Sequence, residues 1–205
     1  MSIILRNFAT DCISGVWKLE ENETDLLRLV NLSDIDLQWL ATISNAKRRR
    51  EIIAVRVLLQ NLGLNFQINY KNGKPYCNNG FISISHSKSM VAVIYHTKHE
   101  VTVDIEEIND KLLRIGERVF SENEIAFANK DLEKLTILWN CKECAYKIFG
   151  NDHTDFKHNI KILPFNNDEK IICEIENNNG KQILKLNCLK IENNMLVWNV
   201  IIGGG

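Results

Sequence analysis

The stretch FISISHSKSMVAVIYHTKHEVTVDIE, residues 81–106, decides the fold. Its first part, residues 81–85, alternates apolar and polar side chains with the period of a half-buried strand. Residues 90–95 form a continuous apolar run, which is typical of a buried strand. Polar residues at 97–100 make a connection, and residues 101–106 have the pattern of another strand. We therefore expect consecutive strands here, with a domain boundary between residues 99 and 100.

Helical patterns flank these strands on both sides. Residues 33–62 carry apolar side chains at helical spacing, with Ser33 as a candidate cap and Gly63 as a candidate end. After the strands, residues 111–120, 121–130 and 132–149 have helical patterns. Ser121 and Glu124 have the spacing of a capping box at the start of the second.

The remaining segments have strand and turn patterns. Residues 3–5, 15–19 and 66–70 are short candidate strands, and residues 72–75 form a candidate turn. Residues 156–202 consist of strand-like runs separated by Asn-rich turns. The sequence thus predicts an α+β fold with two similar halves, residues 1–99 and 100–205.

Composition excludes several classes of protein. The chain has 205 residues, 25 basic against 26 acidic side chains, and a formal net charge of -1. A protein with this balance does not bind nucleic acid through bulk charge, so any anion must be held by a local cluster. No apolar stretch approaches the ~18 residues of a membrane span, and the N-terminus lacks the pattern of a secretory signal. With six scattered cysteines, we expect a cytoplasmic protein without a disulfide framework.

Asp104 and Glu106 lie two residues apart in a predicted strand, so their carboxylates share one face. Two adjacent carboxylates repel each other, and a hard cation such as Mg²⁺ relieves that repulsion while keeping waters for a phosphate. The alternative interpretation is an ordinary solvated strand face.

Trp139, Glu143 and Lys147 follow each other at four-residue spacing, which places them on one side of the predicted helix 132–149. Glu143 and Lys147 could belong to a catalytic set. The alternative is a core tryptophan beside an ordinary surface ion pair.

Cationic and hydroxyl side chains form two further candidate groups. Ser85, His86 and Ser87 end a predicted strand and could donate hydrogen bonds to a phosphate, although a lone histidine can be purely structural. The basic run 47–50, with Arg56 and with Lys74 in the turn, could clamp a phosphate ester or form a solvated face. Together with the carboxylates, these groups are the components of phosphoryl-type transfer.

The order of these motifs resembles that of the 4′-phosphopantetheinyl transferases. The motifs are Gly73-Lys74-Pro75, Ile84-Ser85-His86-Ser87, Asp104-Ile105-Glu106 and Trp139 to Lys147, with Arg118 to Glu124 similar to the segment before the catalytic helix. The length is similar to that of the Sfp-like, surfactin-synthetase-activating subgroup. That resemblance implies a pseudo-dimer of two α/β subdomains, with the active site in the cleft between them, acting as a monomer.

The resemblance also implies an activity. The enzyme would move the 4′-phosphopantetheine arm of coenzyme A to a serine of an acyl- or peptidyl-carrier protein, releasing adenosine 3′,5′-bisphosphate. Mg²⁺ would be held by Asp104, Glu106 and Glu143. Glu143 would also be the general base, and Lys147 would stabilise charge on the phosphates. The expected contacts to coenzyme A are Arg50, Arg56, Lys74, Ser85, His86 and Lys147, with Arg48, Arg49 and Arg50 offering three registers for the arginine.

Two features depart from this pattern. Thr102 lies two residues before Asp104, where the family often has glycine. Cys141 and Cys144 bracket Glu143 as a Cys-x-x-Cys pair, which could indicate a redox or zinc protein rather than buried packing thiols. A non-catalytic module that binds coenzyme A or a nucleotide is the other alternative. The sequence leaves open the carrier, the pathway and the use of acyl-coenzyme A.

Overall fold

The computed structural model describes residues 3–9, 11–150, 153–166, 170–177 and 180–199. The chain divides into two compact units, residues 1–98 and 99–205, called unit 1 and unit 2 below. Each unit has its own buried apolar cluster and its own main sheet. Helices and antiparallel strands occur in both, which confirms the predicted α+β class.

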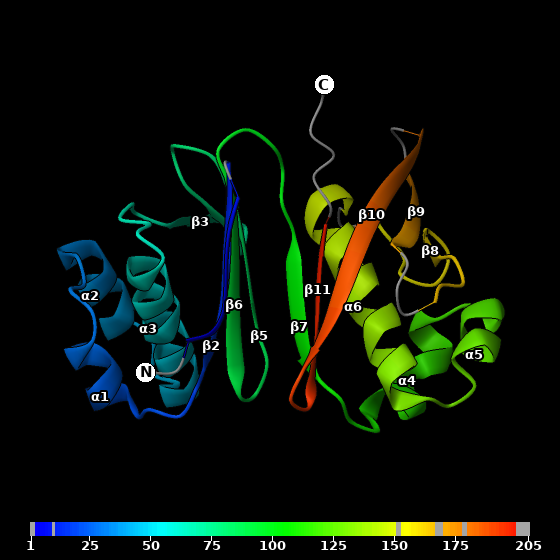
Figure 1. The fold of residues 1–205 in the computed structure, drawn as a ribbon, viewed down its shortest axis with the longest axis horizontal. Coiled ribbons are helices and arrows are strands. Elements are labelled where there is room, and N and C mark those ends of the chain that lie inside the picture. The colour runs from blue at the N-terminus through cyan, green and yellow to red at the C-terminus, as the bar shows by residue number, and fades with distance from the viewer. Residues whose placement is uncertain (1–2, 10, 151–152, 167–169, 178–179, 200–205) are drawn as a thin grey trace. The chain divides into compact units, whose positions relative to one another are not determined.

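Unit 1 is built on a four-stranded antiparallel sheet in the order β1-β2-β6-β5. Its strands are β1 (Ile3–Ala9), β2 (Cys12–Lys18), β5 (Phe81–His86) and β6 (Met90–His96). Three helices cover one face of this sheet (Figure 1): α1 (Glu23–Arg28), α2 (Asp34–Ala41) and α3 (Ala46–Asn61). The buried side chains of β6 include Val91 and Val93, which pack with those of α3 in one cluster.

Helix α3 begins and ends where the sequence provides caps. The side chain of Asn45 accepts a hydrogen bond from the amide of Arg48, and Gly63 follows the helix with φ +74, a left-handed conformation that suits glycine. The predicted helical region 33–62 contains a first helix that Ser33 caps, as the sequence indicates, and then α3; α2 ends at Ala41 and Thr42 is its C-cap. Helix α1 has six residues, too few to show a helical period in the sequence.

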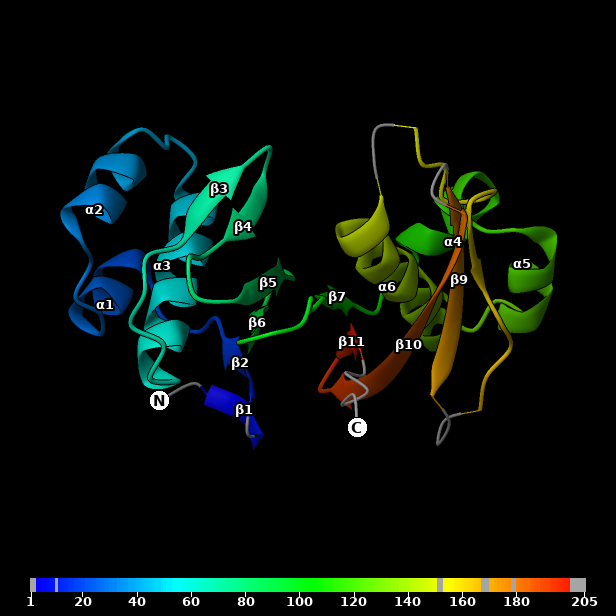
Figure 2. The same cartoon turned by 90° about the horizontal axis from the view of Figure 1, so that it is seen from above.

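A small hairpin of β3 (Asn69–Lys71) and β4 (Lys74–Tyr76) stands beside the main sheet of unit 1 (Figure 2). Asn72 and Gly73 connect the strands with φ +51 and φ +77, the two left-handed residues of a tight hairpin turn. The predicted strand 66–70 begins only at Asn69. Before it, Ile68 is buried and Phe66 packs against Tyr95, so these residues fill the core instead of pairing as strand.

Unit 2 has a five-stranded antiparallel sheet in the order β7-β11-β10-β9-β8. The strands are β7 (Val103–Glu107), β8 (Ile160–Ile162), β9 (Ile171–Asn177), β10 (Gly180–Ile191) and β11 (Asn194–Asn199), and the helices are α4 (Lys111–Val119), α5 (Glu122–Ala128) and α6 (Leu132–Phe149). Helix α6 contacts all five strands. The last predicted strand-like run extends to residue 202, and its residues 200–202 lie outside the described part.

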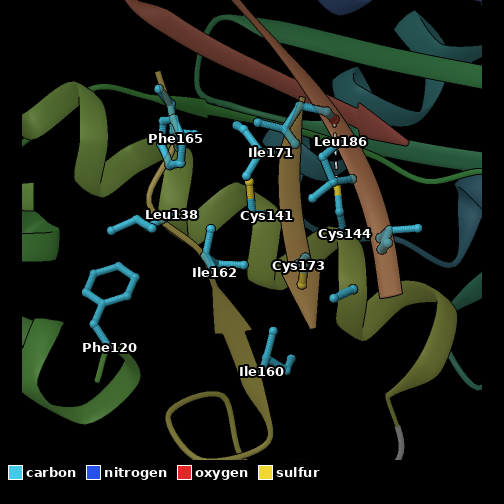
Figure 3. Close-up of a cluster of buried hydrophobic side chains, with 14 of the residues drawn as sticks. Phe120, Leu138, Cys141, Cys144, Ile160, Ile162, Phe165, Ile171, Cys173 and Leu186 are labelled. Atoms are coloured by element: carbon cyan, nitrogen blue, oxygen red, sulfur yellow. Dashed lines mark hydrogen bonds between the residues drawn. The ribbon is translucent and has the colours of Figure 1, made fainter. Parts of the chain in front are cut away.

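The core of unit 2 forms where α6 meets the sheet. Figure 3 shows Cys141 and Cys144 reaching from α6 among Ile171, Cys173 and Leu186. These side chains are fully buried, so the two cysteines of the Cys-x-x-Cys pair contribute to packing.

Lys142 is a fully buried lysine next to this apolar cluster. Its ammonium lies 3.0 Å from Oε1 of Glu124 and donates hydrogen bonds to the carbonyls of Phe156 and Ile160. Glu124 also completes the capping box of α5 with Ser121 and accepts a hydrogen bond from the amide of Ile162. One buried ion pair therefore joins α5, α6 and the segment that leads into β8.

Replacing Lys142 by Met should destabilise the protein by about 3–5 kcal/mol, because it leaves the Glu124 carboxylate buried without its cation. Lys190→Ala is the matched control, since Lys190 forms an exposed ion pair with Glu133 and should cost at most about 1 kcal/mol. Urea unfolding of both variants measures the difference. Equal losses would contradict the central role of the buried pair.

Candidate active site

One face of α6 carries the predicted site residues of unit 2. Trp139, Glu143, Tyr146 and Lys147 share this face by helical spacing, whereas Cys141 and Cys144 point into the core. Asp131 caps the helix by accepting hydrogen bonds from the amides of Glu133 and Lys134. The cap fixes the residue at which α6 begins.

Lys147 joins this helix face to β7. Its ammonium lies 2.7 Å from Oδ1 of Asp104 and donates a hydrogen bond of 2.8 Å to the carbonyl of Val103. Asp104 is 3 % exposed, so its carboxylate has little access to water. Although burial alone lowers the pKa of Lys147, the charges of Asp104 and Glu143 outweigh it and raise the pKa. Lys147 is therefore a permanently charged ammonium beside a buried carboxylate.

Glu143 lies in a crowded carboxylate environment. Burial, followed by the charge of Asp104, raises the pKa of Glu143 to about 7, although Lys147 partly opposes the shift. Burial and the charge of Asp104 also raise the pKa of Glu106. Asp104, Glu106 and Glu143 therefore act on one another electrostatically, and Lys147 does not fully neutralise them.

Trp139 shares the face of α6 that carries Glu143 and Lys147. It is half-buried and stacks on Phe156, with 5.5 Å between ring centroids. Its ring also packs against the buried apolar cluster of unit 2, as expected of a core tryptophan.

The three carboxylates are oxygen donors of the type that Mg²⁺ prefers, but they are not gathered as a ligand set. Among the described residues, no group of three His, Cys, Asp or Glu side chains has the geometry to hold a metal ion. The ammonium of Lys147 lies against Asp104. The donor chemistry and the excess negative charge fit a divalent cation, and binding one requires the carboxylates to draw together.

In unit 1, His86 lies in a basic cluster at the start of α3. Nη1 of Arg48 lies 2.8 Å from Nε2 of His86, so the guanidinium donates and the imidazole accepts as a neutral ring. Glu51 is buried beneath them, 3.3 Å from Arg48 and 3.6 Å from Lys47. Two half-exposed or exposed cations therefore surround one carboxylate, which leaves net positive charge at the surface.

The other arginines predicted to bind phosphate have different partners. Arg50 donates to the carbonyls of Leu19 and Glu21, and Arg56 forms a buried ion pair of 2.7 Å with Asp36. Both guanidiniums have partners inside unit 1, and the phosphate contacts of Arg50 and Arg56 stay predictions. Of the three registers left open by the sequence, the one that places an arginine beside His86 is Arg48.

Of the two remaining residues predicted to contact coenzyme A in unit 1, Ser85 is buried and Lys74 is exposed. Ser85 is buried on β5, and its side chain projects to the strand face opposite His86. Lys74 is exposed in β4, next to the Asn72-Gly73 turn. The structure thus brings His86 together with Arg48 and Glu51, but does not bring the Ser85 hydroxyl to the same face.

The Cys-x-x-Cys pair does not have the environment of a reactive dithiol. Burial raises the pKa of both Cys141 and Cys144 far above the range in which a thiolate forms. All six cysteines, each within the described residues, are free thiols. These observations favour packing thiols over redox chemistry. The departure at Thr102 is also accommodated, because this residue is fully buried beside Asp104 without disrupting the strand that follows it.

Residues 100–194 match the family model of the 4′-phosphopantetheinyl transferase superfamily. The match covers a little under half of the chain, lies wholly in unit 2, and includes Asp104, Glu106, Glu143 and Lys147. It confirms the predicted resemblance at the level of the superfamily for this segment. A comparison with curated proteins finds no match. Of the helices in the described segments, none has the length and apolar character needed to cross a membrane.

The sequence did not single out Arg48 from the basic run 47–50 as the partner of His86, and it did not identify Lys142 as a buried residue. A lysine that is buried in a helix needs a buried anion as its partner. Glu124 was identified as a cap residue, but its second partner lies 18 residues away and only the fold brings them together.

Glu143→Gln should make the stability of the metal-free protein less sensitive to pH. Because folding raises the pKa of Glu143 from 4.5 to about 7, its contribution is fully present below pH 4.5 and is lost as pH rises through about 7. The neutral amide has no such loss. In chelator-containing buffer, the melting temperature of the variant relative to wild type should therefore increase between pH 5 and pH 8.

Glu117→Gln, which changes an exposed glutamate on α4, is the control and should give no pH-dependent difference. A constant offset for Glu143→Gln across this range would mean that Glu143 is ordinarily ionised in the folded protein.

Proposed function

We propose that the protein transfers the 4′-phosphopantetheine arm of coenzyme A to a serine of an acyl- or peptidyl-carrier protein. The observation that carries this proposal is the coupled set of Asp104, Glu106, Glu143 and Lys147 within the segment that matches the transferase superfamily. The resemblance to the Sfp-like subgroup, a cytoplasmic location, a pseudo-dimeric arrangement and a monomeric state are further parts of the same proposal.

Asp104, Glu106 and Glu143 would hold Mg²⁺. The bound ion would supply neutralising charge for the pyrophosphate of coenzyme A and for the transition state. Support comes from the chemistry of the donors and from the raised pKa values of Glu106 and Glu143, which arise first from burial and then from the charge of Asp104. A divalent cation would offset that charge.

Glu143 would accept the proton of the carrier serine. The pKa of Glu143 is raised to about 7 in the metal-free protein, and a bound Mg²⁺ would lower it, so that the ionised form able to accept a proton would predominate near neutral pH. As the serine oxygen bonds to the β-phosphorus, the bond to the bridging oxygen breaks and adenosine 3′,5′-bisphosphate leaves. The proton of the serine passes to Glu143, directly or through a water.

Lys147 would stabilise the charge that develops on the phosphate oxygens. Its ammonium is held by Asp104 and by the carbonyl of Val103, so it is oriented before any substrate binds. A donor that needs no reorganisation contributes more to the transition state than a mobile surface lysine.

The basic cluster of unit 1 would contact phosphate groups of coenzyme A. Arg48 and His86 are the strongest candidates, because both are at the surface and share one location. Arg50, Arg56, Lys74 and Ser85 remain proposed contacts, and Arg48 is added to them. Lys47 lies in the same cluster and adds to its positive charge.

The test of activity is a reaction of the protein with coenzyme A, Mg²⁺ and a panel of apo carrier proteins, followed by mass spectrometry of the carriers. We expect the mass gain of a phosphopantetheine group on a serine. Glu143→Gln should lower the rate at least about 100-fold by removing the base, while circular dichroism stays unchanged. Coenzyme A binding without modification of any carrier would contradict the proposal and favour a non-catalytic binding module.

Arg48→Ala should raise KM for coenzyme A about tenfold or more, with a smaller effect on kcat, because it removes a charge-assisted contact to a phosphate. Arg49→Ala is the matched control, since the adjacent guanidinium is occupied by Glu23. Steady-state kinetics with varied coenzyme A measures both. Equal effects of the two substitutions would remove Arg48 from the proposed contact.

A further inference from the structure

Asn140 is a fully buried amide on α6 that ties this helix to the sheet of unit 2. Its Nδ2 donates a hydrogen bond of 2.6 Å to the carbonyl of Met195 on β11. Because a backbone carbonyl can only accept, this contact also fixes which end of the amide is the nitrogen. Met195 is the register partner of Glu106 on β7, so the tie reaches the sheet directly across from a carboxylate of the candidate site.

Another tie between α6 and the sheet lies two turns further along the helix. The ammonium of Lys147 donates to the carbonyl of Val103 and contacts Asp104, both on β7. Asn140 precedes Lys147 by seven residues, so the two side chains leave α6 in nearly the same direction. Glu143 is three residues after the first tie and four before the second. The two contacts together set how far the backbone of Glu143 lies from the strands opposite it.

The stability of the fold does not account for an amide at position 140. Oδ1 of Asn140 is buried and has no hydrogen-bond partner among the described residues. Leaving a buried acceptor unpaired costs more than one neutral hydrogen bond returns, and an apolar side chain of similar size would incur no such cost. Cys141 and Cys144, its neighbours on the buried side of α6, belong to the apolar cluster. The amide supplies what an apolar side chain lacks, a directed contact with β11.

We propose that Asn140 is a positioning residue, which together with Lys147 fixes the separation between β7 and the face of α6 that carries Glu143. Its consequence for metal binding rests on the proposed function, in which Glu143 and the two carboxylates of β7 hold one cation. Ligands on two different elements form a site only when their spacing is held closely, so loosening one tie lowers the affinity for the ion.

Carbonyl-carbon NMR tests the positioning role without metal or substrate. In the sequence, Met195 is the only methionine followed by leucine, and Val103 is the only valine followed by aspartate. Pairwise ¹³C and ¹⁵N labelling therefore isolates each carbonyl signal. Asn140→Leu should shift the Met195 signal, because its hydrogen bond is lost, and the Val103 signal, because the Lys147 contact loosens. The melting temperature should equal or exceed that of wild type, because the unpaired acceptor is removed.

Thr136→Val is the matched control. Thr136 is equally buried one turn earlier on α6, but its hydroxyl donates to the carbonyl of Leu132 in the same helix. It should leave both carbonyl signals unchanged. Asn140→Ala removes the tie without adding bulk and should shift both signals, which keeps the test available if the leucine is not accommodated. An unchanged Val103 signal in the variants of Asn140 that fold would overturn the proposal and leave Asn140 a purely structural role.

The consequence for the cation is measured separately, by Mn²⁺ binding in the presence of coenzyme A. Asn140→Leu should weaken Mn²⁺ binding about 10-fold, and Thr136→Val should not. If both carbonyl signals shift while wild type neither binds Mn²⁺ nor modifies a carrier, the positioning role stands and the proposed function fails. If wild type binds Mn²⁺ and Asn140→Leu binds it equally well, the cation site does not depend on this tie and the proposal is overturned.

Discussion

The ion pair between Asp104 and Lys147 is the contact on which the site of unit 2 depends. Lys147 spans from α6 to the first strand of the sheet, because its ammonium also donates to the carbonyl of Val103. This places Glu143, one turn earlier on the helix, opposite the carboxylates of β7. Without that cation, Asp104 would be a buried carboxylate lacking its counter-charge, which proteins tolerate poorly.

Helix α6 has an apolar face that packs against the sheet and a second face that carries charged side chains. One face packs Cys141 and Cys144 against the sheet, and the other presents Glu143 and Lys147. Lys142 lies between these faces and uses its charge internally, on Glu124 and two carbonyls. Trp139, on the same side of the helix as Glu143, stacks on Phe156 of the segment that leads into β8. The functional face is therefore fixed by contacts that the buried face and its neighbours provide.

The sequence was sufficient to predict elements whose signals are local. Helix α6 was expected at 132–149 and begins and ends at those residues, since its cap and its period are both in the sequence. The capping box of α5 was predicted for the same reason. By contrast, the candidate strand 66–70 begins only at Asn69, because tertiary packing decided this boundary.

The candidate site shows the same division between local and distant signals. Spacing alone placed Glu143 and Lys147 on one helix face and Asp104 and Glu106 on one strand face, and the ion pair joins the two elements. The sequence could not distinguish Arg48 from Arg49 and Arg50, which differ only in partners from distant segments: His86, Glu23, and the carbonyls of Leu19 and Glu21. Asn140 carried no signal of its contact, because its partner, the carbonyl of Met195, lies 55 residues further along the chain.

In the proposed function, Asp104, Glu106 and Glu143 form one cation site although they are not gathered as ligands in this structure. Mn²⁺ binding followed by electron paramagnetic resonance, with coenzyme A present and Mg²⁺ as competitor, measures whether they do. We expect one Mn²⁺ per chain, displaced by Mg²⁺, and at least about tenfold weaker binding after either Asp104→Asn or Glu143→Gln. Unchanged Mn²⁺ affinity in both variants would contradict it.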